Sequence, residues 1–487
     1  SNMIAAVAKI VGEERVSNKQ EILEKYSGDF TPSLVVWPES TAEVAQIIAW
    51  ANSSKVAVVP VSSGEPRRRG TSTPKVSGAI IVDLSRMKRI IRIDLKNKVA
   101  MVEAGVTYGE LISELEENGL RPLMPLLPKA SKSVVASCLD KEPITTPRFH
   151  WDSSDPLLCT ETIFGSGDVF RTGAAAGPGT LEEQWKSGQA QKNPMGPSQF
   201  DPFRIIQGSQ GTIGIVTWIS MKCETRTEQS KVYLAGADEL EKLYAFAYRI
   251  LKRKLSDDLF ILNRASLASA LGAGRDEIDK LREELPKWIL ILSVAGFGLL
   301  AGEELAYREA DMLDIAREFD VKLVEKMGSV TSSDVQSILG TPCLGTYWKY
   351  RYSGACFEVN FLTKLNETFR HWRAFTRTAD AQGISPTDIG AYLQPTIQGT
   401  NTHCYFDIYY DPNNPEEVDR ANSLYLEGSK ALMEQGAFFH VPSPAIADTV
   451  FGHSSPGMIS ALKNVKEIFD PNHVLSPGNL CFKEVPK

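Results

Sequence analysis

The amino-acid sequence predicts an α+β protein of two domains. Near the N-terminus a run rich in β-forming residues ends at Pro60, and another begins at Gly78. Between them lies an irregular stretch that contains Gly64 and Gly70. From about Thr225 the pattern changes to longer helical segments that alternate with strands, which indicates a separate α+β domain.

The stretch between the first two strands has the composition of an anion-binding loop. Glycine permits a positive φ and a close approach of the backbone to a ligand. Hydroxyl side chains beside backbone N–H groups can complete a nest for a pyrophosphate, and the loop offers Ser62, Ser63, Thr71 and Ser72. No GxGxxG leads into a helix here, so a Rossmann fold is disfavoured. An ordinary connecting loop has the same residue types.

Local patterns predict the elements around this loop. Ser40 and Glu43 predict a capping box at a helix start, and Thr107 with Glu110 predicts a second one. The first of these helices is expected to bury Val44, Ile47, Ile48 and Ala51. Strands are expected in a hairpin at 90–103, in a hairpin at 157–171 and after the glycine-rich turn in 204–222.

The second domain is predicted from its alternating helical and strand patterns. Its helices are expected near 238–254, 301–318, 363–382 and 415–434. Its strands are expected near 288–295, 320–325, 355–361 and 403–410. Before it, residues 173–203 are rich in Gly, Pro and Gln and are expected to form a long surface loop.

Composition excludes several classes of protein. The chain has 487 residues and a formal net charge of −7, which argues against nucleic acid as the main partner. No apolar run has the length of a membrane span. The seven cysteines are scattered without a CxxC pair, which fits neither a disulfide framework nor a zinc or iron–sulfur site. A reducing, cytoplasmic location is therefore expected.

Several motifs, in this order, resemble one enzyme family. They include PSLVVWPESTAEVAQIIAWAN (32–52), VPVSSGEPRRRGTSTPKVSG (59–78), GSQGTIGIVT (208–217) and FDPNHVLSPG (469–478). The series spans nearly the whole chain. It is similar to the FAD-linked oxidases and dehydrogenases of the vanillyl-alcohol oxidase and p-cresol methylhydroxylase type.

The resemblance implies an FAD-binding domain in two parts and a cap that carries the substrate pocket. Residues 1–224 would form the FAD-binding domain, 225–450 the α+β cap, and 451–487 a C-terminal segment that returns to the FAD-binding domain. The implied pyrophosphate residues are Pro60, Ser62, Ser63, Gly64, Glu65, Gly70 and Thr71. The remaining FAD groove would be lined by Ser133, Val134, Ser137, Gly214, Ile215 and Val216. In such enzymes the cofactor supplies the hydride chemistry.

Within the family, THCYFDIYYDPNNPEEVDRA (402–421) resembles the phenol-oxidising branch. The α-hydroxy-acid branch carries a HxGxGxxH-like metal motif at this place. Only its last position remains here, as His403, and Thr396 occupies the first, so no catalytic metal is expected.

The chain also departs from the phenol oxidisers at substrate-binding positions. Their loop tyrosine and their late Tyr-Arg pair correspond here to Arg69, Phe439 and His440. The resemblance therefore implies an anionic substrate, a phenolate or a carboxylate, held by Arg69 with help from His440 or Arg68. Alternatively, Arg69 belongs to a solvated basic run that touches only the FAD phosphates.

His403 is the candidate catalytic base, because a histidine has a proton affinity near working pH. A satisfied core histidine at a strand start is the alternative. Residues at which other members attach their flavin correspond to Cys356 or lie near Tyr347, Tyr350 and Tyr352. Non-covalent FAD is expected.

The implied function is hydride transfer to FAD from an aromatic alcohol or a para-alkylphenol-like substrate. One alternative is an FAD-dependent 2-hydroxy-acid dehydrogenase. The other is a non-catalytic subunit that has lost flavin, which Pro66 in the phosphate loop and the replaced glycines in 131–152 suggest. The electron acceptor stays open, and a homodimer is expected.

Overall fold

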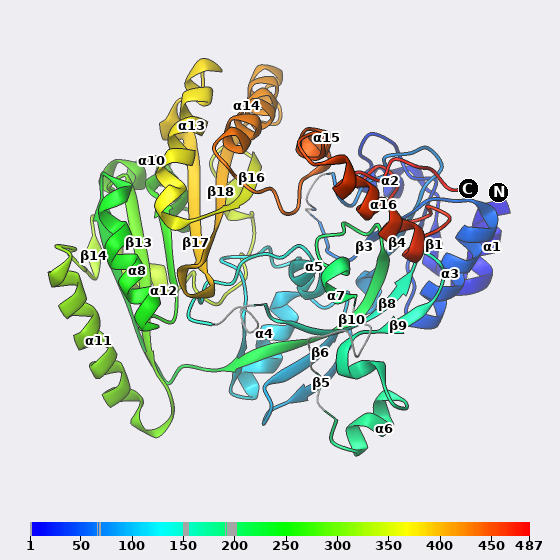
Figure 1. The fold of residues 1–487 in the computed structure, drawn as a ribbon, viewed down its shortest axis with the longest axis horizontal. Coiled ribbons are helices and arrows are strands. Elements are labelled where there is room, and N and C mark those ends of the chain that lie inside the picture. Colours follow the sequence, from blue (N-terminus) through cyan, green and yellow to red (C-terminus); the bar gives the residue numbers. More distant parts are fainter. Residues whose placement is uncertain (1, 66, 68–69, 150–154, 190, 192–201) are drawn as a thin grey trace.

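The structure is a computed structural model that describes residues 2–65, 67, 70–149, 155–189, 191 and 202–487. It has three parts, each built on one sheet (Figure 1). The first lobe, at the right of Figure 1, carries both ends of the chain. The second lobe lies beside it, and the cap forms the left side of the molecule. The predicted α+β class is confirmed.

The first lobe is a four-stranded sheet in the order β1-β2-β4-β3. Its strands are β1 (Val16–Ser17), β2 (Leu34–Val36), β3 (Val58–Val61) and β4 (Ile80–Asp83), and its helices include α1 (Asn2–Val11), α2 (Gln20–Leu23) and α3 (Thr41–Ser54). β2 and β3 both run parallel to β4. The loop at 62–79 therefore leaves the carboxyl end of a parallel strand, where open α/β sheets bind ligands.

The start of α3 differs in one respect from a capping box. The Ser40 hydroxyl accepts the N–H of Glu43, and the helix buries the expected apolar residues. The Glu43 carboxylate, however, accepts from the backbone N–H of Glu39 and forms a two-point ion pair with Arg15. In a capping box the Glu43 carboxylate would accept the backbone N–H of Ser40. Here the carboxylate binds a charged partner from outside the helix instead.

The second lobe is an antiparallel sheet in the order β5-β6-β10-β8-β9, with β7 paired to β10. Its strands are β5 (Ile90–Asp94), β6 (Val99–Glu103), β7 (Leu120–Pro122), β8 (Leu157–Phe164), β9 (Val169–Arg171) and β10 (Gly214–Thr225). Its helices are α4 (Tyr108–Glu117), α5 (Val134–Leu139), α6 (Leu181–Lys186) and α7 (Phe203–Ile206). Both predicted hairpins are confirmed.

The cap is a six-stranded sheet in the order β11-β13-β12-β17-β18-β16. Its strands are β11 (Gln229–Ala237), β12 (Leu259–Asn263), β13 (Trp288–Gly296), β16 (Ala355–Thr363), β17 (Ile389–Thr396) and β18 (Asn401–Tyr410), and a small hairpin joins β14 (Lys326–Met327) to β15 (Val330–Thr331). The helices are α8 (Tyr244–Arg253), α9 (Arg264–Leu271), α10 (Arg275–Glu284), α11 (Ala301–Glu318), α12 (Ser332–Gln336), α13 (Thr368–Ala381) and α14 (Pro415–Glu434).

Two predicted elements are wrong. Residues 320–325 are not a strand, because the N–H of Val321 returns to the carbonyl of Ala316 at the end of α11. Only Val324 bridges to β11. The stretch 173–203 is not a loop throughout, because Thr180 and Glu183 form a capping box that starts α6.

The C-terminal segment joins the first lobe. After α15 (Pro444–Gly452) and α16 (Pro456–Phe469), the chain runs beside β3. The N–H of Val58 donates to Val474, and the N–H of Ser476 donates back to Val58. Buried Lys466 donates to the carbonyls of Thr212 and Leu475, which ties α16 to the turn before β10.

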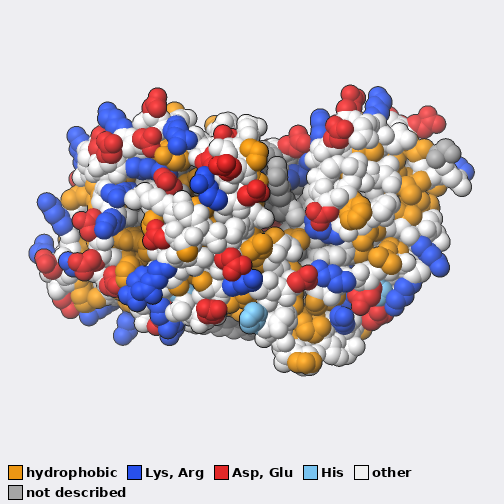
Figure 2. Space-filling model, turned by 90° about the horizontal axis from the view of Figure 1, so that it is seen from above, with side chains coloured by type: hydrophobic (Ala, Val, Ile, Leu, Met, Phe, Trp, Pro, Cys, Tyr) orange, Lys and Arg blue, Asp and Glu red, His pale blue; other side chains and the backbone are white. Residues whose placement is uncertain are grey.

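The cap also contacts the second lobe directly. The guanidinium of Arg121 on β7 binds both carboxylate oxygens of Asp257 at 2.6 and 2.9 Å. Next to it, the Thr145 hydroxyl donates to Asp258 at 2.6 Å. On the face in Figure 2, basic and acidic side chains are interspersed over both ends of the molecule. No helix within the described residues is long and apolar enough to cross a membrane.

Candidate active site

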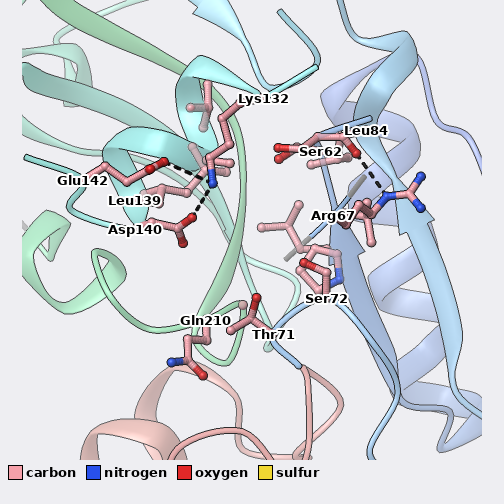
Figure 3. A pocket seen from close by; sticks show the side chains of 18 of the residues that line it. Ser62, Arg67, Thr71, Ser72, Leu84, Lys132, Leu139, Asp140, Glu142 and Gln210 are labelled. Atoms are coloured by element: carbon pink, nitrogen blue, oxygen red, sulfur yellow. Dashed lines mark hydrogen bonds and ion pairs between the residues drawn. The ribbon is translucent and has the colours of Figure 1, made fainter. Parts of the chain in front are cut away.

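A groove that is partly open to solvent lies where the two lobes meet. Figure 3 shows Ser62, Arg67 and Ser72 on one side and Lys132, Asp140 and Glu142 on the other. Seven of the predicted cofactor residues line it: Pro60, Ser62, Ser63, Thr71, Gly214, Ile215 and Val216. The loop after β3 and the start of β10 thus face the same space.

Two glycines in the loop allow close backbone contacts. Gly64 donates its N–H to the carbonyl of Ser131, and a Cβ there would lie 3.2 Å from the Cβ of Ser131. Gly70 has a φ of +101°, and a Cβ would lie 3.1 Å from Pro444. A side chain at Gly70 is therefore strained by its backbone as well as by its neighbour.

Arg67 anchors the loop to the first lobe. Its Nε donates to the carbonyl of Ser63, and its guanidinium lies 4.2 Å from the ring centroid of Tyr26. Exposed Glu65 is 3.6 Å from this guanidinium. Arg67 is thus committed to holding the loop, whereas Arg69 lies outside the described residues and keeps its role only as a prediction.

The predicted residues around α5 are placed differently from those of the loop. Ser133 is fully buried at the helix start, donates to the carbonyl of Ala104 and accepts from Ala136. Ser137 accepts from Tyr108, and the backbone of Val134 donates to Val106. The side chains of Ser133 and Ser137 thus bond within the second lobe, and Val134 is part of the buried core. The groove itself is lined by the other face of the segment, through Val135, Ala136 and Leu139.

The groove fits FAD. Gly211 lines it, and a Cβ there would lie 2.7 Å from Pro60, so this passage between the lobes admits no side chain. The hydroxyls of Ser62, Ser63 and Thr71 suit phosphates. Apolar side chains for the planar rings are supplied from the opposite wall by Val135, Ile215 and Val216.

A pair of histidines adjoins the groove. His403 lies on β18 and His440 in the segment between α14 and α15. Their ring centroids are 5.0 Å apart, with the ring planes at 87°. A Cβ on Gly208 would lie 3.9 Å from the carbonyl oxygen of His440, and the N–H of Gly208 donates to groove-lining Leu139. The two predicted histidines are therefore brought together close to a segment that lines the groove, although neither is among the described residues that line it.

Both imidazoles are held neutral. Burial lowers the pKa of His403 well below its usual value, and His440 and Lys141 lower it further. Burial lowers the pKa of His440 to about 4, with a further contribution from Lys141. Nδ1 of His403 and both ring nitrogens of His440 make no hydrogen bond with any described residue. These ring nitrogens are therefore available to accept a hydrogen bond from a ligand or to donate one to it.

Lys141 is the residue at this site that the sequence analysis missed. Its Cε would be 3.8 Å from a Cβ on Gly208, and its charge acts on both histidines. Burial lowers the pKa of Lys141, although Asp155 opposes this. In the sequence it is a lysine between two acidic residues, Asp140 and Glu142, and this pattern alone does not distinguish it from a surface lysine.

No group of three or more His, Cys, Asp or Glu side chains that could hold a metal ion occurs in the described part of the chain. Near the groove, acidic side chains are instead paired with a cation. Lys132 lies 2.6 Å from Asp140 and 3.2 Å from Glu142. On the cap side, Tyr347 also lines the groove, and the ammonium of Lys129 lies 5.1 Å from its ring centroid.

Comparisons with known proteins agree with the assignment of this groove to FAD. Residues 32–139 match the family model described as FAD binding domain. The chain is 23% identical over 473 residues to the flavoprotein subunit of 4-cresol dehydrogenase [hydroxylating] of Pseudomonas putida, covering 92% of this chain and 87% of that protein. It is 28% identical over 463 residues to the mitochondrial D-lactate dehydrogenase [cytochrome] of Arabidopsis thaliana, covering 92% and 73%.

Solved structures show the same fold. Substrate-bound p-cresol methylhydroxylase superposes with a TM-score of 0.84 at 19% identity, covering 99% of this chain and 96% of the other. The 4-ethylphenol oxidase of Gulosibacter chungangensis gives 0.83 at 18% identity, covering 99% and 97%. The chain is an FAD-dependent oxidase or dehydrogenase with the FAD-binding fold of the p-cresol methylhydroxylase type.

Proposed function

We propose that the protein oxidises an aromatic alcohol or a para-alkylphenol-like substrate that binds as an anion. FAD, when bound, supplies the hydride acceptor. The observation that carries the proposal is the pair of neutral histidines near the groove, three of whose ring nitrogens make no hydrogen bond with a described residue. A neutral imidazole can take the proton that a phenol loses when it binds as phenolate, or the proton that an alcohol hydroxyl loses as its carbon–hydrogen bond breaks.

The described residues supply the remaining binding groups. Lys141 provides a positive charge beside the histidines and makes no hydrogen bond or ion pair with a described side chain. It can pair with a phenolate oxygen, the role that the sequence analysis assigned to Arg69. His440 can add an N–H donor to the same oxygen.

A 2-hydroxy acid is the second candidate, and Lys141 is also the feature that favours it. An ammonium beside a neutral base suits a carboxylate next to a hydroxyl. Relatives of similar identity include D-lactate dehydrogenase and, at 28%, the glycolate oxidase subunit GlcD of Bacillus subtilis. Dehydrogenases and oxidases among the relatives favour either enzyme over a non-catalytic subunit.

A substrate panel separates the two candidates. The purified protein would be mixed without oxygen with aromatic alcohols, para-alkylphenols, D-lactate and glycolate, while flavin absorbance is followed. We expect rapid bleaching with one or more of the phenols or aromatic alcohols. Bleaching by hydroxy acids alone would assign the second function, and no bleaching by any compound would refute both.

We further propose that FAD is held without a covalent bond. Cys356 is a poor attachment residue, because burial raises the pKa of its thiol well above the usual value. The Tyr347 ring packs at nearly right angles against Tyr350. Acid precipitation tests the proposal: we expect the yellow colour in the supernatant, and colour in the pellet would contradict it.

Two further proposals concern the cellular location of the protein and its oligomeric state. All seven cysteines are free thiols, which favours a reducing compartment such as the cytoplasm. A homodimer remains our expectation from the family resemblance. Light scattering of the purified protein tests it, and a monomer mass would exclude it.

The histidine pKa values predict an unusual pH profile. Burial holds the pKa of the base, His403, well below its usual value and lowers that of His440 to about 4, so both imidazoles stay neutral in weakly acidic solution. We expect the acid limb of kcat/KM well below pH 6.5, and a limb near 6.5 would contradict this. In the unfolded chain a histidine takes up a proton near pH 6.5. The contribution of neutral His440 to the free energy of unfolding is therefore fully present above pH 6.5 and decreases as the pH falls toward 4.

The Lys141→Met substitution tests the anion site. We expect KM for an ionisable phenol to rise about 10- to 100-fold, because a charged hydrogen bond is lost. KM for its methyl ether should change little. The acid limb should also move toward neutral pH, since Lys141 lowers the pKa of both histidines. Lys252→Met, on the exposed face of α8, is the control; equal effects on the phenol and its ether would refute the role.

A further inference from the structure

One buried side chain joins the two walls of the FAD groove. Asn479 is 1% exposed, in the turn after Ser476 near the C-terminus. Its Nδ2 donates to the carbonyl oxygens of Thr71 and Gln210, each at 3.1 Å. Thr71 belongs to the loop of the first lobe and Gln210 to the turn before β10, and both line the groove. Figure 3 shows them next to each other at one end of it.

Other contacts hold the same two segments to the C-terminal part of the chain. The side-chain Nε2 of Gln210 donates to the carbonyl of Pro442 at 2.6 Å. Pro444 packs against Gly70, one residue before Thr71. Asn479 is distinct among these contacts because a single amide group reaches both walls. The loop at 70–79 has no helix or strand of its own, so its position depends on such contacts.

Three polar atoms in this region are buried without a hydrogen-bond partner among the described residues. They are Oδ1 of Asn479, Oε1 of Gln210 and the hydroxyl of Ser476. The Ser476 hydroxyl would lie 3.0 Å from a Cβ on groove-lining Gly211. Buried acceptors are normally satisfied. A hydroxyl-rich ligand in the adjoining groove, or water that it orders, would supply the missing donors.

We propose that Asn479 is a positioning residue for FAD and acts as a latch that holds the two walls of the groove together. Without its amide, the carbonyls of Thr71 and Gln210 lose their shared donor, and the loop is free to move away from β10. The inference concerns retention of the cofactor and does not depend on which substrate is oxidised.

The test compares Asn479→Ala with Asn472→Ala, another tail residue whose Nδ2 donates to Asn52 and does not line the groove. FAD release would be followed by the recovery of flavin fluorescence after dilution of the holoprotein. We expect release to be about tenfold faster or more in Asn479→Ala, because the carbonyls of two groove-lining residues lose the donor that they share. Asn472→Ala should stay within about twofold of the unchanged protein, since it removes a single hydrogen bond to a side chain that does not line the groove. Equal release rates in all three proteins would overturn the proposal.

A second readout separates a latch from general structural support. Added FAD should raise the Tm of apo Asn479→Ala less than that of the unchanged apoprotein, while the two apo Tm values stay close. A lower apo Tm with an unchanged FAD increment would refute the latch. If the variant does not fold, hydrogen exchange on the unchanged protein decides. FAD should protect amides at 70–72 and 476–479, and unchanged exchange there would overturn the proposal.

Discussion

Replacing His403 with glutamine is expected to lower kcat by about 10²–10⁴-fold, the usual loss when a general base is removed. Glutamine is close in size to histidine and can form hydrogen bonds, but it cannot take up a proton near neutral pH. Since the side chain is 9% exposed, the substitution leaves a polar group in the same buried place. Stopped-flow flavin reduction under substrate saturation measures the effect.

His453→Gln is the matched control, because His453 is exposed and, among the described residues, its ring bonds to the carbonyl of Thr449 alone. The flavin spectrum and Tm of His403→Gln must match those of the unchanged protein for the rate to be interpreted. A fall of less than about tenfold would exclude His403 as the base, since general bases contribute more than this.

A double substitution shows whether the two histidines act as one unit. Their ring centroids are 5.0 Å apart, so their effects are expected to be coupled. If His440→Gln lowers the rate to the same level and the double variant no further, the pair works together. If the effects multiply, the two residues have separate tasks, with His440 bound to the substrate anion.

Lys349→Met is expected to lower the free energy of unfolding by about 3–5 kcal/mol, the cost of breaking a buried ion pair from one side. The ammonium lies 3.0 Å from Asp407 and 2.9 Å from Glu358, and its side chain is 3% exposed. Burial opposes its charge, but these carboxylates outweigh that effect and hold the pKa of Lys349 well above its usual value. Methionine fills the space and leaves the carboxylates without their cation.

Urea unfolding of the apoprotein measures this loss. The control is Lys430→Met, which removes an exposed pair with Glu427 and should cost less than about 0.5 kcal/mol. A loss below about 1 kcal/mol in Lys349→Met would mean that the buried carboxylates find other partners. The ion pairs also fix the segment before β16 to the cap sheet, so Tyr347 at the groove should be displaced in the same variant.

Elements that form through residues adjacent in the sequence could be predicted from local sequence patterns. The loop after β3 was predicted because glycines and hydroxyls lie between two strong strand patterns, and four residues assigned to its phosphate site, Pro60, Ser62, Ser63 and Thr71, line one cavity. The strands β12 and β17 were missed. Both are buried along their whole length, so neither shows the alternation that marks a half-exposed strand.

The site depends on contacts that span the chain, and these leave little trace in the sequence. Ser133 and Ser137 have the composition of binding residues, yet the rotation of α5 turns them toward Ala104 and Tyr108. Lys141 lies outside every motif and matters only because β18 and the segment after α14 approach it in space. Arg69 stays a prediction.

The position of Asn479 in the chain has a consequence for biosynthesis. The residue is separated by 408 positions from Thr71 and by 269 from Gln210. A protein leaves the ribosome N-terminus first, and its domains fold in that order. Both lobes and the cap are therefore made before the amide that joins the groove walls exists. A nascent chain thus presents an open groove until Asn479 has left the ribosome.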